Sequence, residues 1–380
     1  MRVAYVALSA RGGTALYSAI LAGRVGEASP VLYVGPEHLP DVERPKGVEY
    51  RPVKTGYTHA EVAWRTLKPY GYVEIAKAIK AFRPDLVHFT LSHPWNPIVA
   101  VMLGSTPIVF TVHDPAPHSR AKWRHITEVT HQLMYRRASR IIALSQHSLS
   151  LLPEGFKSKA TVIPHPVFEH YRIEAPPPKP LRPSAVFFGR LEPYKGLGIF
   201  CEAAARLSAE GVNADFVIAG PGRFRHCLRG TTPAAVTIIN RFLSEQEVSQ
   251  LLAAASVLVL PYTDATQSGV LAAAYAARLP VVATTAGSFP EFVRNGVSGL
   301  LVPPNDPAAL AAAIRRVLLD SVLRDRLSSG ADELARTVLS WNEVVGRHFE
   351  LYTGLFRKHP FKPMVRTEPE RLGRADNMPV

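Results

Sequence analysis

Short apolar runs alternate with longer amphipathic segments along the whole chain. In the first half, strands are predicted at residues 3–8 (VAYVAL), 31–35 (VLYVG), within 83–90 (RPDLVHFT), and at 107–114 (PIVFTVHD) and 140–145 (RIIALS). Segments such as GYVEIAKAIKAF (71–82) and RHITEVTHQLMYRRA (124–138) have helical spacing. Strands that are apolar on both faces and alternate with helices are typical of a parallel, doubly wound α/β sheet.

The same pattern restarts after the proline-rich stretch IEAPPPKPLRPS, residues 173–184. Proline resists both helix and central strand, so this stretch is predicted to be a linker. Beyond it, strands are predicted at 185–190, 215–220, 236–242, 255–262 and 279–285, and helices at about 196–210, 244–254, 268–278 and 307–319. We therefore predict two Rossmann-like α/β domains, 1–172 and 185–352, that face a cleft, with the segment 353–380 packing back on the first.

The composition agrees with this fold and limits the compartment. The chain is 47% hydrophobic and 20% charged, which permits two sizeable cores. No apolar run approaches the roughly 20 residues that span a bilayer, and the N-terminus resembles a strand more than a signal peptide. Cys201 and Cys227 are the two cysteines, without metal-like spacing. These features predict a cytoplasmic protein without a metal site.

The net charge of +13 is concentrated in the first half, where residues 1–172 hold 21 basic and 12 acidic side chains. One hypothesis is a peripheral surface for anionic lipid, with Trp64, Trp123 and Tyr72 at the interface. Its basic residues would be Lys54, Arg65, Lys68, Lys77, Lys80, Arg83, Arg120, Lys122, Arg124, Arg136 and Arg137. A dispersed solvated surface is the alternative. No nucleic-acid-binding motif is present, so no nucleic-acid partner is expected.

Two cations stand where a strand of the second half ends. In FFGRLEPYKG, Arg190 and Lys195 lie between the strand and the next helix. A guanidinium can chelate phosphate oxygens and an ammonium acts as a mobile point charge, so the pair suits a diphosphate. Taken alone, the pair could equally be two surface cations on a loop.

The stretch PYTDATQSGVLAAAYAARLPVVAT, residues 261–284, predicts an anion site of another kind. Its helix begins near Ser268, and the N–H groups of a helix N-terminus bind anions. Gly269 allows a ligand to approach the backbone. The alternative is an ordinary capped helix that packs Val270, Leu271 and Tyr275 into the core.

Several segments in order resemble the GT4-type retaining glycosyltransferases of the GT-B fold. They are GRLEPYKG, DFVIAGPG, FLSEQEVSQLLAAASVLVLPY and LPVVATTAGSFPEFVRNGVSGLLVPPNDPAALAAAI, preceded by SARGGTALYSAIL, DLVHFT, PIVFTVHD, RIIALSQHSLSLL and VIPHPV. The resemblance covers roughly residues 2–355. It implies a nucleotide-sugar donor held mainly by the C-terminal domain and an acceptor held mainly by the N-terminal one.

The resemblance also implies roles for individual residues. Arg190 and Lys195 match the family's donor-diphosphate cations, and His113 matches a histidine near the transferred sugar. Gly12 and Gly13 match a glycine loop near the donor, although a simple strand–helix turn would also explain them. The implied donor-binding set is completed by Phe242 and Leu243, whose main chain would contact the base, and by Asp264, Thr266, Gln267, Ser268, Gly269 and Val270.

The chain departs from the family in the 261–284 stretch. Most members carry two glutamates with seven residues between them, and here those positions are Ala265 and Ala273. The amides of residues 266–270 can still bind phosphate, because they are backbone groups. Recognition of the sugar hydroxyls would then fall to Asp264 or Gln267. Glu291 is explained by a position at the start of its own helix.

The resulting hypothesis is transfer of a hexose from a nucleoside-diphosphate sugar, with retention and without a cofactor or metal, to a glycan or a lipid-linked sugar. The family suggests front-side attack, with the leaving phosphate taking the acceptor's proton. Two alternatives remain open: a non-catalytic partner protein of the GT-B fold, and a nucleotide-sugar epimerase of the same fold.

Overall fold

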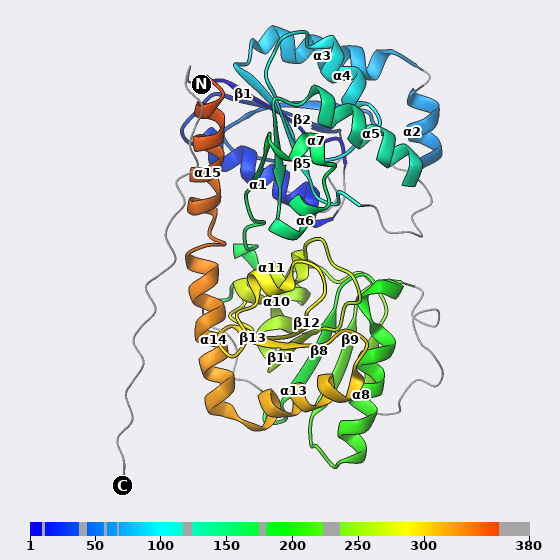
Figure 1. Ribbon diagram of the computed structural model, residues 1–380, viewed down its shortest axis with the longest axis vertical. Helices are drawn as coiled ribbons and strands as arrows, with labels where there is room; N and C mark the ends of the chain where they lie inside the picture. The colour runs from blue at the N-terminus through cyan, green and yellow to red at the C-terminus, as the bar shows by residue number, and fades with distance from the viewer. Residues whose placement is uncertain are drawn as a thin grey trace.

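The computed structural model describes residues 1–9, 12–37, 44–56, 59–66, 68–116, 124–174, 180–222 and 236–356, which form two layered α/β units (Figure 1). A seven-stranded sheet and a six-stranded sheet organise them. Every described strand pair is parallel. This arrangement confirms the predicted fold class. We call the elements around the seven-stranded sheet the first domain and those around the six-stranded sheet the second domain.

The first sheet has the strand order β3-β2-β1-β4-β5-β6-β7. Its strands are β1 Val3–Val6, β2 Val31–Pro36, β3 Glu49–Val53, β4 Leu86–Phe89, β5 Ile108–Val112, β6 Arg140–Ala143 and β7 Ala160–Val162. Its helices are α1 Gly13–Gly26, α2 His59–Thr66, α3 Tyr70–Phe82, α4 Asn96–Met102, α5 Arg124–Arg137, α6 Gln146–Ser150 and α7 Glu154–Lys157. The strand order proceeds outward from β1 to β3 on one side and from β4 to β7 on the other. Ligand sites are expected at this switch point between β1 and β4.

The second sheet has the strand order β10-β9-β8-β11-β12-β13. Its strands are β8 Ser184–Phe188, β9 Asp215–Ala219, β10 Val236–Ile239, β11 Val257–Leu260, β12 Val281–Thr284 and β13 Gly299–Val302. Its helices are α8 Leu197–Ala209, α10 Glu245–Ala254, α11 Gly269–Ala276, α12 Phe289–Phe292, α13 Pro307–Leu319 and α14 Ser321–Arg336. A 3-10 turn, Pro193–Lys195, precedes α8.

Each sheet is covered on both faces, which explains its continuously apolar strands. In β1 every residue is buried. Ala4 and Val6 belong to the core on one face, whereas Val3 and Tyr5 belong to the core on the other. Strands without a solvent face show no alternation of polar residues, as the sequence pattern predicted.

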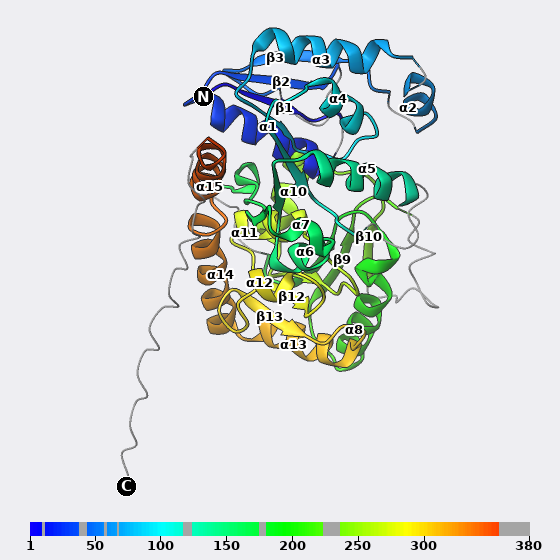
Figure 2. The same cartoon turned by 45° about the horizontal axis from the view of Figure 1, so that its top comes forward.

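The last described helix, α15 (Trp341–Gly354), returns to the first domain. Figures 1 and 2 both show α14 and α15 running along one side of the two sheets. Trp341, Val344 and Tyr352 lie in the same core cluster as Val3 and Tyr5. The chain therefore contacts the first domain already from Trp341, before the predicted segment 353–380. The domain boundaries remain a prediction, and residues 175–179 of the linker and 357–380 of the tail lie outside the described residues.

Three strands were not predicted from the pattern: β3, β7 and β13. β3 (EYRPV) lies at a sheet edge with its first four residues exposed or half-buried, and β7 (ATV) has only three residues. Edge strands tolerate polar side chains and proline. β3 therefore lacks the apolar run that marks a central strand, and β7 is too short to show one. The reason does not apply to β13 (GLLV), which is apolar and mostly buried.

Histidines whose pKa is lowered by burial predict how stability depends on pH. Burial lowers the pKa of His165 and His348 to about 4, that of His113 to about 3, and that of His88 well below 6.5. In the unfolded chain such groups take up protons near pH 6.5. The free energy of unfolding should therefore fall as the pH drops from 6.5 toward 4, with a slope of about 1.4 kcal/mol per pH unit for each such proton.

Urea unfolding of the wild type and of His348→Gln at several pH values between 7.5 and 4 measures this slope. The variant should flatten it, because a glutamine side chain does not titrate. His125→Gln is the matched control, since the His125 side chain is 96% exposed. Equal slopes for the wild type and His348→Gln would contradict the assignment.

Candidate functional site

Two helix N-termini, one from each domain, meet at the ring of Phe168. Gly13 begins α1 after β1, and Gly269 begins α11 after β11. A Cβ atom at either glycine would lie 3.3 Å from an atom of the Phe168 ring. Phe168 itself is buried, and its ring separates the two helices. The positive ends of two helix dipoles therefore converge where the two domains meet.

Gly12 caps α1 in a conformation that only glycine adopts readily. Its φ is 81° and its ψ is 176°. No side chain caps this end of α1, and its first turn holds no acidic residue. Gly12 and Gly13 are exposed, and open space surrounds the Cβ position of Gly12. The predicted glycine loop is thus a helix N-terminus with accessible backbone.

Lys195 is a buried cation, only 8% exposed. Its Nζ lies 5.3 Å from the centre of the Tyr262 ring and would be 3.0 Å from a Cβ at Gly189. Among the described residues, no carboxylate lies within 4.0 Å of this ammonium. Burial, followed by the charge of neighbouring Arg190, lowers the pKa of Lys195, although Tyr194 and Glu192 oppose the shift. An anion bound here would stabilise a charge that the protein leaves largely uncompensated.

The N-terminus of α11 lies beside this lysine. A Cβ at Gly189 would be 3.1 Å from Cγ2 of Val270, so Gly189 is in contact with both Lys195 and Val270. The Ser268 hydroxyl caps α11 by accepting from the Leu271 amide at 3.3 Å. The first turn of α11 holds no acidic residue. Lys195, exposed Arg190 and this helix end thus form one positively polarised site at the carboxyl ends of β8 and β11.

The two alanines in place of the family glutamates are part of the core. Ala265 and Ala273 are each 2% exposed and belong to one hydrophobic cluster with Leu271 and Tyr275. Neither presents a polar atom beyond its backbone. Of the two suggested replacements, Asp264 is exposed, whereas Gln267 holds a buried Oε1 that has no hydrogen-bond partner among the described atoms.

His113 follows β5 and is held as a neutral imidazole. Its Nε2 lies 3.0 Å from the carbonyl oxygen of Thr90, so we assign the proton to Nε2, which donates to that carbonyl. Its Nδ1 is buried without a described partner, and burial lowers its pKa to about 3. The edge of the ring faces Tyr17 at 5.4 Å between ring centres. The residue can accept a hydrogen bond at Nδ1 but cannot supply positive charge.

Phe242 and Leu243, the remaining predicted donor-binding residues, lie at the same edge of the second sheet as Lys195. Phe242 is 77% exposed, and Leu243 packs against the core beside it. Both follow β10, and the carbonyl oxygen of Phe242 accepts from Arg241 at 3.1 Å. Parallel strands place their carboxyl ends along one edge, so this segment shares an edge with Lys195 and the start of α11.

His93 and Asn96 are loop-forming residues. His93 Nδ1 accepts from the Trp95 amide at 3.2 Å, and Asn96 Nδ2 donates to the Leu91 carbonyl at 2.5 Å. Both side chains are buried. These contacts stabilise the proline-rich loop between β4 and α4.

Contacts between the domains were not foreseen from the sequence. Glu291 does stand in the first turn of α12, but its carboxylate accepts from the amides of Gln146 and His147, at the start of α6 in the other domain. Ser148 donates to the carbonyl of Thr266, and the Ser145 hydroxyl lies within hydrogen-bond distance of both that oxygen and Ser148 Oγ. The motif SQHS (145–148) predicts a helix cap, but its partners Thr266 and Glu291 are more than a hundred residues away along the chain. A local sequence pattern cannot predict such partners.

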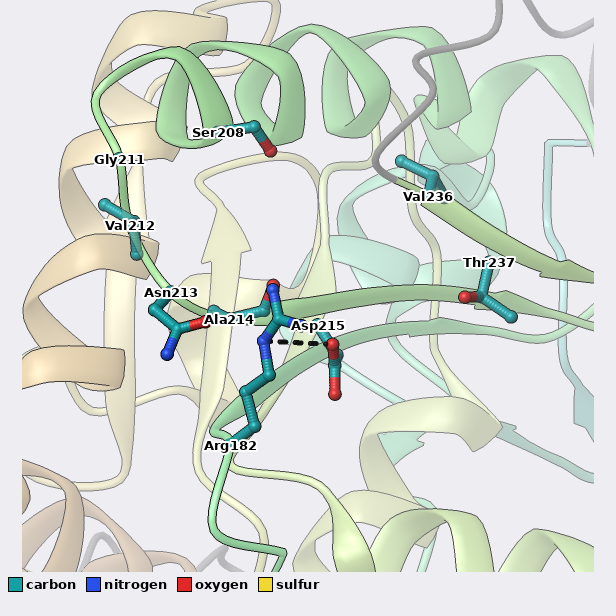
Figure 3. Close-up of a pocket in the computed structure, with 9 residues that line it drawn as sticks. All are labelled: Arg182, Ser208, Gly211, Val212, Asn213, Ala214, Asp215, Val236 and Thr237. Atoms are coloured by element: carbon teal, nitrogen blue, oxygen red, sulfur yellow. Dashed lines mark hydrogen bonds and ion pairs between the residues drawn. The ribbon is translucent and has the colours of Figure 1, made fainter.

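A separate cavity of about 530 Å³ lies at the opposite edge of the second sheet. Figure 3 shows it lined by residues near the amino ends of the strands, with Arg182 and Asp215 joined by an ion pair of 3.3 Å. The lining residues are Arg182, Ser208, Gly211, Val212, Asn213, Ala214, Asp215, Val236 and Thr237. It therefore lies away from Lys195, at the end of the sheet where open α/β folds do not bind their ligands.

Two family profiles match the two halves of the chain. Residues 29–169 match "Glycosyltransferase Family 4", and residues 182–320 match "Glycosyl transferases group 1". Curated relatives include the alpha-D-kanosaminyltransferase of Streptomyces kanamyceticus, 31% identical over 40% of this chain and 41% of that protein. Glycogen synthase of Mycobacterium tuberculosis is 27% identical over 72% of this chain and 69% of that protein. The first three curated relatives are matched over only 24–42% of their length.

Solved structures share the fold over nearly the whole chain. Sucrose-phosphate synthase from Thermosynechococcus elongatus has a TM-score of 0.75 at 18% identity, covering 93% of this chain and 99% of that one. HepE from Anabaena, in complex with UDP and glucose, has a TM-score of 0.72 at 19% identity, covering 93% of this chain and 100% of that one. At this identity the likeness shows the fold.

The backbone of Gly12 gives a direct prediction. Gly12→Ala should destabilise the protein by about 1–3 kcal/mol, because alanine is strained in this conformation. Urea unfolding measures the loss. Gly346→Ala is the control, since Gly346 is exposed in the interior of α15 with open space at its Cβ, and this change should stabilise by about 0.5–1 kcal/mol. An unaffected Gly12→Ala protein would refute the strain argument.

Proposed function

We propose that this chain, which belongs to the GT-B glycosyltransferase family, transfers a hexose from a nucleoside-diphosphate sugar to an acceptor hydroxyl. The observation that carries the proposal is the buried Lys195 ammonium beside Arg190 and the N-terminus of α11. These groups suit a diphosphate, which is the leaving group of such a donor. HepE of Anabaena, which shares the fold, was solved with UDP-glucose and supports this choice of donor.

The site would act mainly by electrostatic stabilisation. As the bond from the anomeric carbon to the diphosphate breaks, negative charge grows on the leaving oxygen. Lys195, Arg190 and the backbone N–H groups of residues 266–270 would stabilise that charge without reorganising. Gly12 and Gly13 would bring the start of α1 to the donor from the other domain. His113, being neutral, would accept a hydrogen bond from the transferred sugar at Nδ1.

We further infer a retaining, metal-independent reaction. The second domain offers two cations and a helix dipole as the counter-charge for the diphosphate. No carboxylate stands at Ala265 or Ala273 to act as a nucleophile for double displacement. Front-side attack would therefore proceed with the leaving phosphate accepting the proton of the acceptor hydroxyl. A protein that binds UDP but turns over no donor would instead fit the non-catalytic alternative, and interconversion of a donor's epimers would fit the other.

The first domain presents an apolar ridge that suits a membrane-associated acceptor. Ile126, Val129 and Leu133 of α5 are 42%, 58% and 43% exposed and share one helix face. Exposed Arg124 and Arg136 lie at either end of α5. No described helix is long and apolar enough to cross a membrane. We therefore propose that the first domain docks on an anionic lipid surface through this α5 ridge, toward a lipid-linked sugar.

The diphosphate assignment is tested by removing its charges. Lys195→Ala and Arg190→Ala should each weaken UDP binding and lower the turnover rate by about 10²–10³-fold. Calorimetry with UDP, followed by a screen of UDP-, GDP- and ADP-sugars for transfer, measures both effects. Arg182→Ala removes a cation at the far cavity and should change neither. Wild-type turnover in the Lys195 and Arg190 variants would reject the site.

The membrane surface has its own test, in which the protein is floated with vesicles of phosphatidylglycerol and phosphatidylcholine. The double variant Ile126→Ser/Leu133→Ser should bind at least tenfold more weakly than the wild type, and salt should weaken wild-type binding. The control is Leu319→Ser/Val322→Ser, because Leu319 and Val322 are 59% and 79% exposed in the second domain. Equal flotation of the ridge variant and the wild type would rule out this surface.

A further inference from the structure

We propose that Ser145, Ser148 and Glu291 form a latch that closes the two domains and orients the donor loop, defined as Asp264–Ser268. This positioning role rests on the proposed function, because it assigns a purpose to the loop that would bind the donor phosphates. Figures 1 and 2 show α6 at the border of the first domain, next to the elements of the second that carry these partners.

The first part of the latch fixes one carbonyl of the donor loop. The Ser148 hydroxyl donates to the Thr266 oxygen at 3.1 Å, and the Ser145 hydroxyl, which also donates to Ser148 Oγ at 2.9 Å, lies 3.3 Å from the same oxygen. Both serines are fully buried, and Thr266 is 7% exposed. In a planar trans peptide the N–H of the following residue points opposite to the carbonyl. Holding the Thr266 oxygen toward α6 therefore directs the Gln267 N–H away from α6.

The second part is a carboxylate that spans the domain boundary. The Glu291 oxygens accept from the amides of Gln146 at 2.6 Å and His147 at 2.7 Å. These amides begin α6, where the helix leaves N–H groups unsatisfied, so a negative charge is favourable. Glu291 lies on α12, and the backbone amide of Ser288, the residue before α12, donates to the Ala265 carbonyl at 3.0 Å. Glu291 and the donor loop are thus connected within the second domain.

All four contacts join the first domain to the second, so opening of the domains must break them together. The same closed arrangement brings the starts of α1 and α11 to either side of Phe168. Closure, orientation of the Gln267 amide and convergence of the two helix ends therefore occur as one event. The latch residues contact the carbonyl side of the Thr266–Gln267 peptide, whereas the donor would meet the N–H of Gln267 on its other side. The latch residues therefore position the loop without touching the donor.

The test measures closure directly. Spin labels at Val101→Cys and Val322→Cys, which are 72% and 79% exposed and lie in different domains, report the interdomain distance in a background without the two native cysteines. We expect Glu291→Ala and Ser148→Ala to shift the distance distribution to longer and broader values. Ser148→Ala leaves the Ser145 hydroxyl free to cap α6 and so guards against a simple loss of that helix. Distributions identical to the wild type would overturn the latch.

A matched control separates positioning from a general loss of stability. Asp306 accepts from the Ala309 amide at 2.8 Å, so Asp306→Ala removes a carboxylate cap that acts within the second domain alone. It should leave the distance unchanged. At saturating donor, transfer should fall at least tenfold in Glu291→Ala, whereas UDP affinity should fall much less, because Arg190 and Lys195 are untouched and only the amides of the donor loop lose their orientation. A parallel fall of UDP affinity and turnover would instead make Glu291 a donor contact and overturn the proposal.

The two proposals fail in different ways. The distance measurement needs neither a known sugar nor turnover, so it tests the latch even if no donor is found. A protein that neither binds UDP nor transfers any sugar, yet opens when Glu291 is replaced, would reject the proposed function and keep the latch as a closing device.

Discussion

Burial of the Lys195 ammonium, which has no carboxylate partner in the described part of the chain, is the constraint around which the candidate site is built. Removing a charge from water is costly unless an opposite charge or a set of dipoles compensates it. The surroundings supply only partial compensation, through the Tyr262 ring and the more distant charge of Glu192, whereas Arg190 opposes it. The site is therefore complementary to an anion that arrives from outside. Glycine suits position 189, because its φ is 117° and a Cβ there would lie only 3.0 Å from Lys195 Nζ and 3.1 Å from Val270 Cγ2.

The positions that align with the family's two glutamates are packed in the core of the second domain. Ala265 and Ala273 lie in the same cluster as the buried face of α11. In the proposed function, phosphate binding would depend on backbone N–H groups and on two cations, and the chain has all of them. Sugar recognition needs a polar side chain instead. Gln267, with its buried and unpartnered Oε1, lies in the same loop as Ala265. One side of helix α11 therefore packs the core, as the second interpretation of the 261–284 stretch holds, whereas anion binding at its first turn stays a prediction.

The two domains are connected in two chemically different ways. Helix α15 attaches to the first domain through buried apolar side chains and through hydrogen bonds in which Tyr352 meets His88 at 2.7 Å and Tyr5 at 2.9 Å. Breaking that attachment would expose a hydrophobic core and orphan buried polar groups. The contacts of α6 with Thr266 and Glu291 are a few hydrogen bonds, and water can replace those of exposed Glu291. The α15 contacts are therefore suited to a permanent attachment, whereas the α6 contacts are suited to repeated opening.

The sequence by itself determined the alternation of elements, because continuous apolar runs and helical periodicity are local consequences of burial on one or both faces. It placed the central strands, the helix after Ser268, and Arg190 and Lys195 at a strand end. It could not reveal edge strands such as β3, which lack an apolar run. Nor could it show that Glu291 caps a helix of the other domain, since Glu291 and Gln146 are 145 residues apart. Only the tertiary structure brought Gly13 and Gly269 to one phenyl ring, because such contacts depend on how two separately folded sheets face each other.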